Sequence, residues 1–269
     1  MSCRCIHFVT LLALIGNARG TVMGKRDEAR NRSNAEVSSS SRERFLRIYR
    51  ALRERICLLE YAPGRQLGEE ELAREFGISR TPIQRVLARL EAEGLLERRH
   101  GVGTIVTDVD LASLEQIYRL RLELATLMGR LAPMRVSVAE ITRLEDYLQR
   151  MDKLVRRPDP GGFARLNMEF NLMLFSLIGN APLREITERL FLQTTRIWIR
   201  SIPSMDDISE EVRIFDRQIF DVIAALRIND HGAVGDICRA HISMSLQRMR
   251  RQTAMPGHGV EVAQNLEAR

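Results

Sequence analysis

The sequence has few of the features that mark an enzyme, a membrane protein or a disulfide-bonded secreted protein. Four cysteines in 269 residues are too few for a disulfide framework. An apolar run at residues 6–15 is too short to span a bilayer. The sequence has no nucleophile elbow, glycine-rich phosphate loop, HExxH motif or clustered carboxylate pair, so nothing in it supports catalysis.

Neither the cysteines nor the histidines suggest a metal site. Cys3 and Cys5 are too close together for metal-site spacing and have no partner ligands nearby. Cys57 and Cys238 lie in helical patterns and are expected to be buried as small hydrophobic residues. The five histidines are scattered along the chain and do not converge.

Residues 67–107 carry the most informative pattern, because two short amphipathic helices are followed there by a glycine-tipped hairpin. The first helix, 69–76, ends at Gly77, and Ser79 is expected to cap the second helix. Strands at 95–99 and 104–107 then flank a turn rich in glycine. This order is typical of a winged helix-turn-helix, which places one helix in the major groove of DNA.

The side chains predicted to contact DNA lie on the polar face of the second helix and on the wing. Residues at the start of such a helix reach base edges, and its dipole favours phosphate. An arginine-rich wing suits phosphate or minor-groove contact. The alternative is an ordinary helix pair with a solvated charged face. The predicted contacts are Arg80, Thr81, Pro82, Gln84, Arg85, Arg89, Arg98, Arg99, His100 and Gly101.

The stretch 52–107 resembles the DNA-binding domain of GntR-type bacterial regulators. The similarity is carried by the segments APGRQLGEEELAREFGISRTPIQRVLARLEAEGLL and RRHGVG. The resemblance implies that the SRTP block opens the recognition helix and that His100 and Gly101 make the wing contact. Two positions depart from the family pattern, since Gln84 and Glu70 each stand where arginine is frequent. Glutamine reads adenine whereas arginine reads guanine, so a different operator preference is expected.

The net charge of +6 is a mild excess rather than a polybasic patch. Specific DNA binding must therefore depend on where the charges are placed. Of the 41 basic residues only Lys25 and Lys153 are lysines, which we attribute to the coding bias of a GC-rich genome.

The chain is predicted to divide into a leader, two domains and a tail. The first 22 residues superficially look like a signal peptide, but a secreted DNA-binding regulator makes little physical sense. We interpret them as an over-extended start, with Met23 as the alternative initiator, or as a disordered leader. The predicted parts are a disordered leader and arm (1–41), a winged helix-turn-helix (42–107), a helical effector-binding and dimerisation domain (109–252) and a flexible tail (253–269).

The second domain is predicted to be an all-α bundle, so the fold class is mainly α. Helical periodicity runs almost without interruption, short loops separate the helices, and strand signals are absent. The expected helices are 111–132, 137–156, 161–179, 182–201, 206–229 and 231–252.

This half resembles the FCD domain that often follows a GntR winged helix, in the FadR subfamily. The segments that carry the similarity are IYRLRLELA, LNMEFNLMLFSLIGNAPL and DVIAALRINDHGAVGDICRAHI. Many FCD domains bind a divalent metal, and the four ligand positions fall here on Asn167, Asn171, Ile219 and His241. Amides are poor ligands for a zinc-type metal and isoleucine is none. We therefore expect that the family metal is lost and that no cofactor is bound.

The candidate effector-binding residues are polar side chains on otherwise apolar helix faces. An arginine that faces a bundle cavity would favour a carboxylate or phosphate ligand. Each candidate also has a purely structural explanation: a hydrogen-bonded core pair for the asparagines, a buried hydrogen-bonded histidine, and surface or ion-paired arginines. The candidates are Arg121, Asn167, Asn171, Arg196 and His241.

These patterns predict a cytoplasmic, nucleoid-associated transcriptional repressor with neither enzymatic activity nor a membrane partner. A homodimer would bind a double-stranded DNA operator with two half-sites. The resemblance implies that a small organic acid-type effector shifts DNA affinity by binding differently to two arrangements of the winged domains. The alternatives are a metal-dependent FCD sensor with atypical ligands and a non-sensory DNA-binding protein, which would have no cavity in its helical half.

Overall fold

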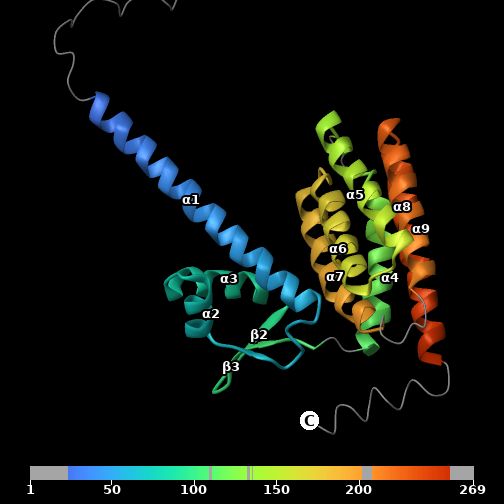
Figure 1. The fold of residues 1–269 in the computed structure, drawn as a ribbon, viewed down its shortest axis with the longest axis horizontal. Coiled ribbons are helices and arrows are strands. Elements are labelled where there is room, and N and C mark those ends of the chain that lie inside the picture. Colours follow the sequence, from blue (N-terminus) through green and yellow to red (C-terminus); the bar gives the residue numbers. More distant parts are fainter. Residues whose placement is uncertain (1–23, 109–110, 132–133, 135, 202–207, 255–269) are drawn as a thin grey trace, which may run out of the picture. The chain divides into compact units, whose positions relative to one another are not determined.

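The computed structural model of the chain describes residues 24–108, 111–131, 134, 136–201 and 208–254. The described residues up to Leu46 and those from Arg47 onward form two compact units. The described residues are mainly helical, with one small sheet, which confirms the predicted fold class (Figure 1). The predicted leader, residues 1–22, lies outside the described residues, as does the tail after residue 254.

The first helix, α1, extends from Gly24 to Cys57 and so starts well before the expected residue 42. Residues 24–41 are therefore helical rather than a disordered arm, and this expectation was wrong. No proline interrupts the chain before Pro63, and the segment contains several good helix formers such as alanine, glutamate and arginine. Its serine-rich polar composition outweighed these local preferences in the sequence-based prediction.

The winged helix forms as its apolar pattern predicts. Helix α2, Glu69–Phe76, has the predicted bounds and ends at Gly77, which takes a left-handed conformation. Helix α3, Arg80–Ala92, buries Ile83, Val86, Leu87 and Leu90. Ser79 occupies the N-cap position of α3, but its side chain makes no capping hydrogen bond, contrary to expectation.

A three-stranded antiparallel sheet of order β1-β3-β2 completes the wing. Strand β2, Leu96–Arg99, pairs with β3, Gly103–Val106, so that Arg99 lies opposite Gly103. Strand β1, Gln66–Leu67, pairs with the other edge of β3 and was not predicted. Two residues are too few to show an alternating pattern.

The helices of the second domain pack as a closed ring. Each contacts two others, in the order α4, α9, α8, α5, α6, α7 and back to α4. Figure 1 shows these helices running alongside one another, as expected for a bundle with short loops. The helices are α4 Leu111–Leu127, α5 Val138–Arg156, α6 Pro160–Ser176, α7 Ala181–Ser201, α8 Ser209–Arg227 and α9 His231–Ala254.

Local sequence explains where several of these helices begin and how closely two of them pack. Ser137 and Glu140 form a reciprocal capping box at the start of α5. Asp159 caps α6 by accepting a hydrogen bond from the Gly162 amide. Helices α4 and α9 approach closely at Gly235, where a Cβ atom would lie only 2.7 Å from a backbone oxygen of α4.

The interior of the ring contains a chain of aromatic rings in edge-to-face contact. Phe163 on α6 contacts both Trp198 on α7 and Phe215 on α8, at centroid distances of 5.4 and 5.7 Å. Phe215 contacts Phe170, which in turn contacts Tyr147 on α5. Such pairs add stability beyond the burial of their area. They fix the positions of α5 to α8 around the space that the ring encloses.

Candidate functional site

The first part of the candidate site is the polar face of α3. All the predicted contact residues of α3 and the wing are exposed except Pro82, which is half-buried. Gly101 at the wing tip has a φ of 76°, a left-handed conformation that favours glycine. The structure therefore places the predicted residues on one helix and one adjoining hairpin, as a winged helix requires.

The start of α3 is bonded to the start of α2 by acidic side chains. Arg80 donates hydrogen bonds from Nη1 to Glu70 Oε1 at 3.0 Å and from Nη2 to Glu69 Oε2 at 3.3 Å. The same oxygen of Glu69 accepts a hydrogen bond from Gln84 Nε2 at 2.7 Å. Two predicted DNA-contacting side chains thus share one carboxylate. The sequence did not indicate this arrangement, because it depends on how the two helices cross.

Other predicted DNA contacts are also engaged by carboxylates. Arg89 Nε lies 2.7 Å from Oε1 of Glu93, a buried residue that also accepts a hydrogen bond from Tyr49. On the wing, Arg99 pairs with Glu97 at 2.6 Å. The arginines of these two pairs remain more than half exposed. Arg99 can exchange its carboxylate for a DNA phosphate at little cost, because surface ion pairs contribute little stability. Arg89 is held more firmly, because its partner Glu93 is buried.

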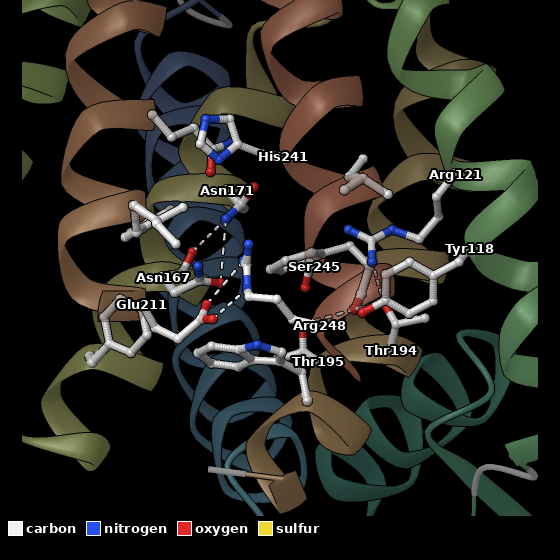
Figure 2. A pocket seen from close by; sticks show the side chains of 17 residues that line it. Tyr118, Arg121, Asn167, Asn171, Thr194, Thr195, Glu211, His241, Ser245 and Arg248 are labelled. Atoms are coloured by element: carbon white, nitrogen blue, oxygen red, sulfur yellow. Dashed lines mark hydrogen bonds and ion pairs between the residues drawn. The ribbon is translucent and has the colours of Figure 1, made fainter. Parts of the chain in front are cut away.

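The second part of the candidate site is a cavity inside the helical ring, with a volume of about 90 Å³. It can hold several water molecules or a small organic molecule. Figure 2 shows its charged and polar side chains, which come from every helix of the ring except α5. The lining residues used below are Tyr118, Arg121, Asn167, Asn171, Phe191, Thr194, Thr195, Trp198, Glu211, Gln218, His241 and Arg248.

Two arginines point into this cavity, but they have different partners. Arg248 Nε lies 2.5 Å from Glu211 Oε1, and this ion pair is largely buried. Arg121 donates a hydrogen bond from Nη1 to Thr194 Oγ1 at 2.7 Å. Its guanidinium also lies over the rings of Tyr118 and Phe191, at 5.1 and 5.5 Å from their centroids. Burial lowers the pKa of Arg121. No carboxylate of the described residues forms an ion pair with it.

The remaining polar groups of the cavity are uncharged. Asn171 Nδ2 donates to the backbone oxygen of Asn167 at 2.9 Å, so part of this amide pair is satisfied within its own helix. His241 lies on α9, and Figure 2 shows it close to Asn171 in that view. Burial and the positive charge of Arg248 lower the pKa of His241, although Asp221 opposes the shift. The cavity therefore combines positively charged and neutral donors with a single buried acid, Glu211.

Comparison with known families matches both parts of this architecture. The family model described as "Bacterial regulatory proteins, gntR family" matches residues 45–106, and the FCD domain model matches residues 116–244. The chain belongs to the GntR family. It is a transcriptional regulator with an FCD domain, and the proteins of this family are not enzymes.

Two curated relatives show how far the similarity extends. The HTH-type transcriptional repressor RspR of Escherichia coli strain K12 is 25% identical to this GntR regulator over 210 residues, which cover 77% of this chain and 90% of RspR. YdhC, an HTH-type transcriptional regulator of Bacillus subtilis strain 168, is 29% identical over 147 residues. That match covers 54% of this chain and 66% of YdhC.

Solved structures share the fold. McbR/YncC of E. coli has a TM-score of 0.61 at 21% identity, covering 77% of this chain and 98% of that chain. A GntR regulator from Rhodococcus sp. RHA1 has a TM-score of 0.55 at 19% identity, covering 76% of this chain and 97% of that chain. Within the described part of this GntR regulator, no helix is both long and apolar enough to cross a membrane.

The cavity of this regulator does not suit the metal that its FCD resemblance implies. Among the described residues, no group of three or more His, Cys, Asp or Glu side chains is placed to hold a metal ion. Asn167, Asn171 and His241 line the cavity, but Ile219 is fully buried outside the lining, and its neighbour Gln218 faces the cavity instead. Two amides and one imidazole beside a guanidinium form a poor donor set for a divalent cation.

Arg196 does not line the cavity, which corrects the expectation from the sequence. Its guanidinium donates to the Thr107 backbone oxygen at 2.7 Å and to Thr107 Oγ1 at 3.1 Å. Only 2% of the residue is exposed. The spacing of apolar residues in α7 indicated that Arg196 points inward. It could not indicate that Arg196 meets Thr107, which directly follows strand β3 of the winged helix.

The sequence reasoning also missed residues that the structure brings to the cavity. Glu211 and Arg248 are far apart in the sequence, and no motif links them. Thr194, Thr195 and Trp198 lie on one face of α7 at helical spacing, and this spacing was the only available signal. It is equally typical of an ordinary core face, so it could not have identified a cavity.

Proposed function

We propose that this GntR regulator is a repressor that binds double-stranded operator DNA as a homodimer in the bacterial nucleoid. A small organic acid in the FCD cavity would change its affinity for that DNA. The α3 residues named above, together with Arg98, Arg99, His100 and Gly101 of the wing, would contact the operator. Arg121, Asn167, Asn171 and His241 would contact the effector.

The observation that carries the effector proposal is Arg121. The buried guanidinium of Arg121 faces the cavity without a carboxylate partner among the described residues, so it has lost much of its hydration. An anionic ligand would restore a charge-assisted, bidentate partner. Arg248 already has Glu211 as its counter-ion, so Arg121 is the better anchor for an added carboxylate. The cavity itself favours a sensory regulator over a non-sensory DNA-binding protein.

Helix α7 offers a physical connection between the cavity and the winged helix. Thr194, Thr195 and Trp198 line the cavity, whereas the opposite face of α7 contacts the winged helix. There Arg196 holds Thr107, and Glu188 pairs with Arg53 of α1 at 3.0 Å. A ligand that shifts α7 would therefore disturb contacts with the DNA-binding domain. Coupling of this kind needs only a difference in ligand affinity between two arrangements.

Separate observations support repression and dimerisation. The relative RspR is described as a repressor. The helical domain exposes large apolar side chains, including Leu120 on α4, Phe220 on α8 and Met244 on α9, which a second copy could cover. Light scattering on the full chain, alone and with operator DNA, tests the dimer. A monomer in both states would contradict it.

The experiment on the effector uses the full chain, a DNA fragment selected by the protein, and a panel of short mono- and dicarboxylates with their amides as neutral controls. We expect at least one carboxylate, and not its amide, to raise the melting temperature and change DNA affinity. Arg121→Met should abolish both responses. Thr107→Val should retain ligand binding and weaken its effect on DNA. Equal responses to acids and amides, or an unchanged response in Arg121→Met, would contradict the proposal.

A further inference from the structure

The acidic side chains at the start of α2 have a place in DNA recognition. Glu69 is only 22% exposed, and it lies between Arg80 and Gln84 of the recognition helix. One of its oxygens, Oε2, accepts hydrogen bonds from both side chains. A carboxylate in this position neutralises part of the positive charge that would attract phosphate. Its presence therefore calls for an explanation other than affinity for DNA.

The hydrogen bond from Gln84 to Glu69 settles which way the glutamine amide faces. The amide group has one oxygen acceptor and a nitrogen with two N–H donors. An ionised carboxylate can only accept hydrogen bonds, so the nitrogen of Gln84, and not its oxygen, must face Glu69. One N–H is used in this contact. Oε1 and the second N–H of an exposed side chain are then left to meet the DNA.

This remaining pattern, one acceptor beside one donor, matches one base in particular. Adenine presents a donor at N6 and an acceptor at N7 in the major groove, whereas guanine presents two acceptors, O6 and N7. With one of its two N–H groups held by Glu69, Gln84 has a single donor left and cannot supply the two donors that guanine requires. We propose that Glu69 is a positioning residue that commits Gln84 to adenine and against guanine. This inference rests on the proposed contact between α3 and the operator.

Arg80 fits the same arrangement. Its guanidinium is held by Glu69 and Glu70, and these three side chains form an ion-paired cluster at the surface. DNA binding has to compete with these carboxylates for Arg80, which reduces sequence-independent attraction to phosphate. Glu69 therefore acts in two ways: it fixes the amide of Gln84, which gives discrimination, and it lowers the affinity for DNA of any sequence.

The test is selection of operators from a random double-stranded DNA pool by the full chain, followed by affinity measurements on single-base variants of the selected site. Wild type should prefer adenine over guanine at one position of each half-site by about tenfold or more, the discrimination expected of a good bidentate pair. Gln84→Ala should remove this preference. Glu69→Ala should reduce it at least threefold while raising affinity for unrelated DNA, because a negative charge is lost.

Glu71→Ala is the matched control. Glu71 lies in the same first turn of α2 and is exposed, and its side chain makes no hydrogen bond or ion pair with any other described residue. It should raise the affinity for all sequences alike without changing the preference for adenine. Glu69→Gln keeps an acceptor oxygen and should give an intermediate preference, which guards against a folding defect in Glu69→Ala.

Three results would overturn the inference, and they can be told apart. A wild type that enriches no sequence would contradict DNA recognition itself. A selected operator whose base preferences are the same in Gln84→Ala would show that Gln84 does not read a base. A preference that depends on Gln84 but is the same in Glu69→Ala and Glu71→Ala would remove the positioning role alone.

Discussion

The winged helix and the helical ring use charged side chains in opposite ways. Arg80 and Arg99 are each more than half exposed, and their carboxylate partners hold them loosely in the presence of water. In the cavity, by contrast, the side chains of Arg248 and Glu211 are 25% and 12% exposed. Charges removed from water depend on their partners, and a missing partner is costly.

Because of this difference, substitutions in the winged helix should affect DNA binding with little effect on stability, whereas substitutions in the cavity should affect both ligand binding and stability. Arginines on α3 can exchange partners, so their replacement should change DNA binding and leave the fold intact. Side chains of the cavity are part of the packed ring, so their replacement should change both ligand binding and stability. The predictions that follow test this contrast, beginning with the largest expected effect.

Charge reversal on the recognition helix should abolish specific binding. Two lost contacts of about 1–3 kcal/mol each, with repulsion added, predict at least about a 100-fold loss of operator affinity for Arg80→Glu combined with Arg85→Glu. Fluorescence anisotropy with a selected operator measures the affinity. Thermal unfolding should show only a small loss of stability, because the lost pairs of Arg80 with Glu69 and Glu70 are at the surface. Arg213→Glu combined with Arg239→Glu makes the same change of charge at exposed positions of α8 and α9 and is the control. Equal losses in both variants would show that only overall charge matters.

The close approach of α4 and α9 at Gly235 should affect the stability of the helical ring and leave DNA binding unchanged. In Gly235→Ala the new Cβ would lie 2.7 Å from the backbone oxygen of Ala125. Overpacking costs about 1–3 kcal/mol and exceeds the gain in helix propensity of about 1 kcal/mol, so we expect a net loss of about 1 kcal/mol in unfolding free energy. Operator affinity without effector should stay unchanged.

Gly232→Ala is the control for this prediction. It lies on the same helix, and its nearest new contact, Asp230 Oδ1 at 3.5 Å, is an ordinary van der Waals distance. We expect its stability to equal or exceed that of the wild type. Urea unfolding of both variants decides the matter, and a Gly235→Ala protein as stable as Gly232→Ala would show that α4 and α9 separate without cost.

The same contrast explains how much could be predicted from the sequence. Elements whose register is set by their own periodicity were predicted well: α2 has the expected bounds, and the expected face of α3 is buried. Arg121, Asn167, Asn171 and His241 were expected to face inward, and the structure brings them to one cavity. Periodicity gives the direction of a side chain, but not the group it meets.

Prediction from the sequence failed where the function of a side chain depends on which residue it contacts in the folded protein. Arg196 meets Thr107 rather than the cavity, and Glu69 meets two side chains of the next helix. The ion pair between Glu211 and Arg248 joins α8 to α9, and neither helix sequence alone indicates it. Strand β1 was missed because its only signal is its partner, β3.

The smallest expected effect is a pH dependence of the unfolding free energy, which arises from the partly buried His241 of the cavity. Burial and Arg248 lower the pKa of His241 below its ordinary value of 6.5, so the folded protein binds fewer protons there than the unfolded chain does. Stability from this residue is therefore complete above pH 6.5 and falls as the pH drops from 6.5 toward the lowered pKa. Relative to His241→Gln, the wild type should lose unfolding free energy over that window, while other groups cancel in the difference. Urea titrations at several pH values measure it. Parallel pH profiles for the two proteins would mean that His241 is as hydrated as a histidine on the wing.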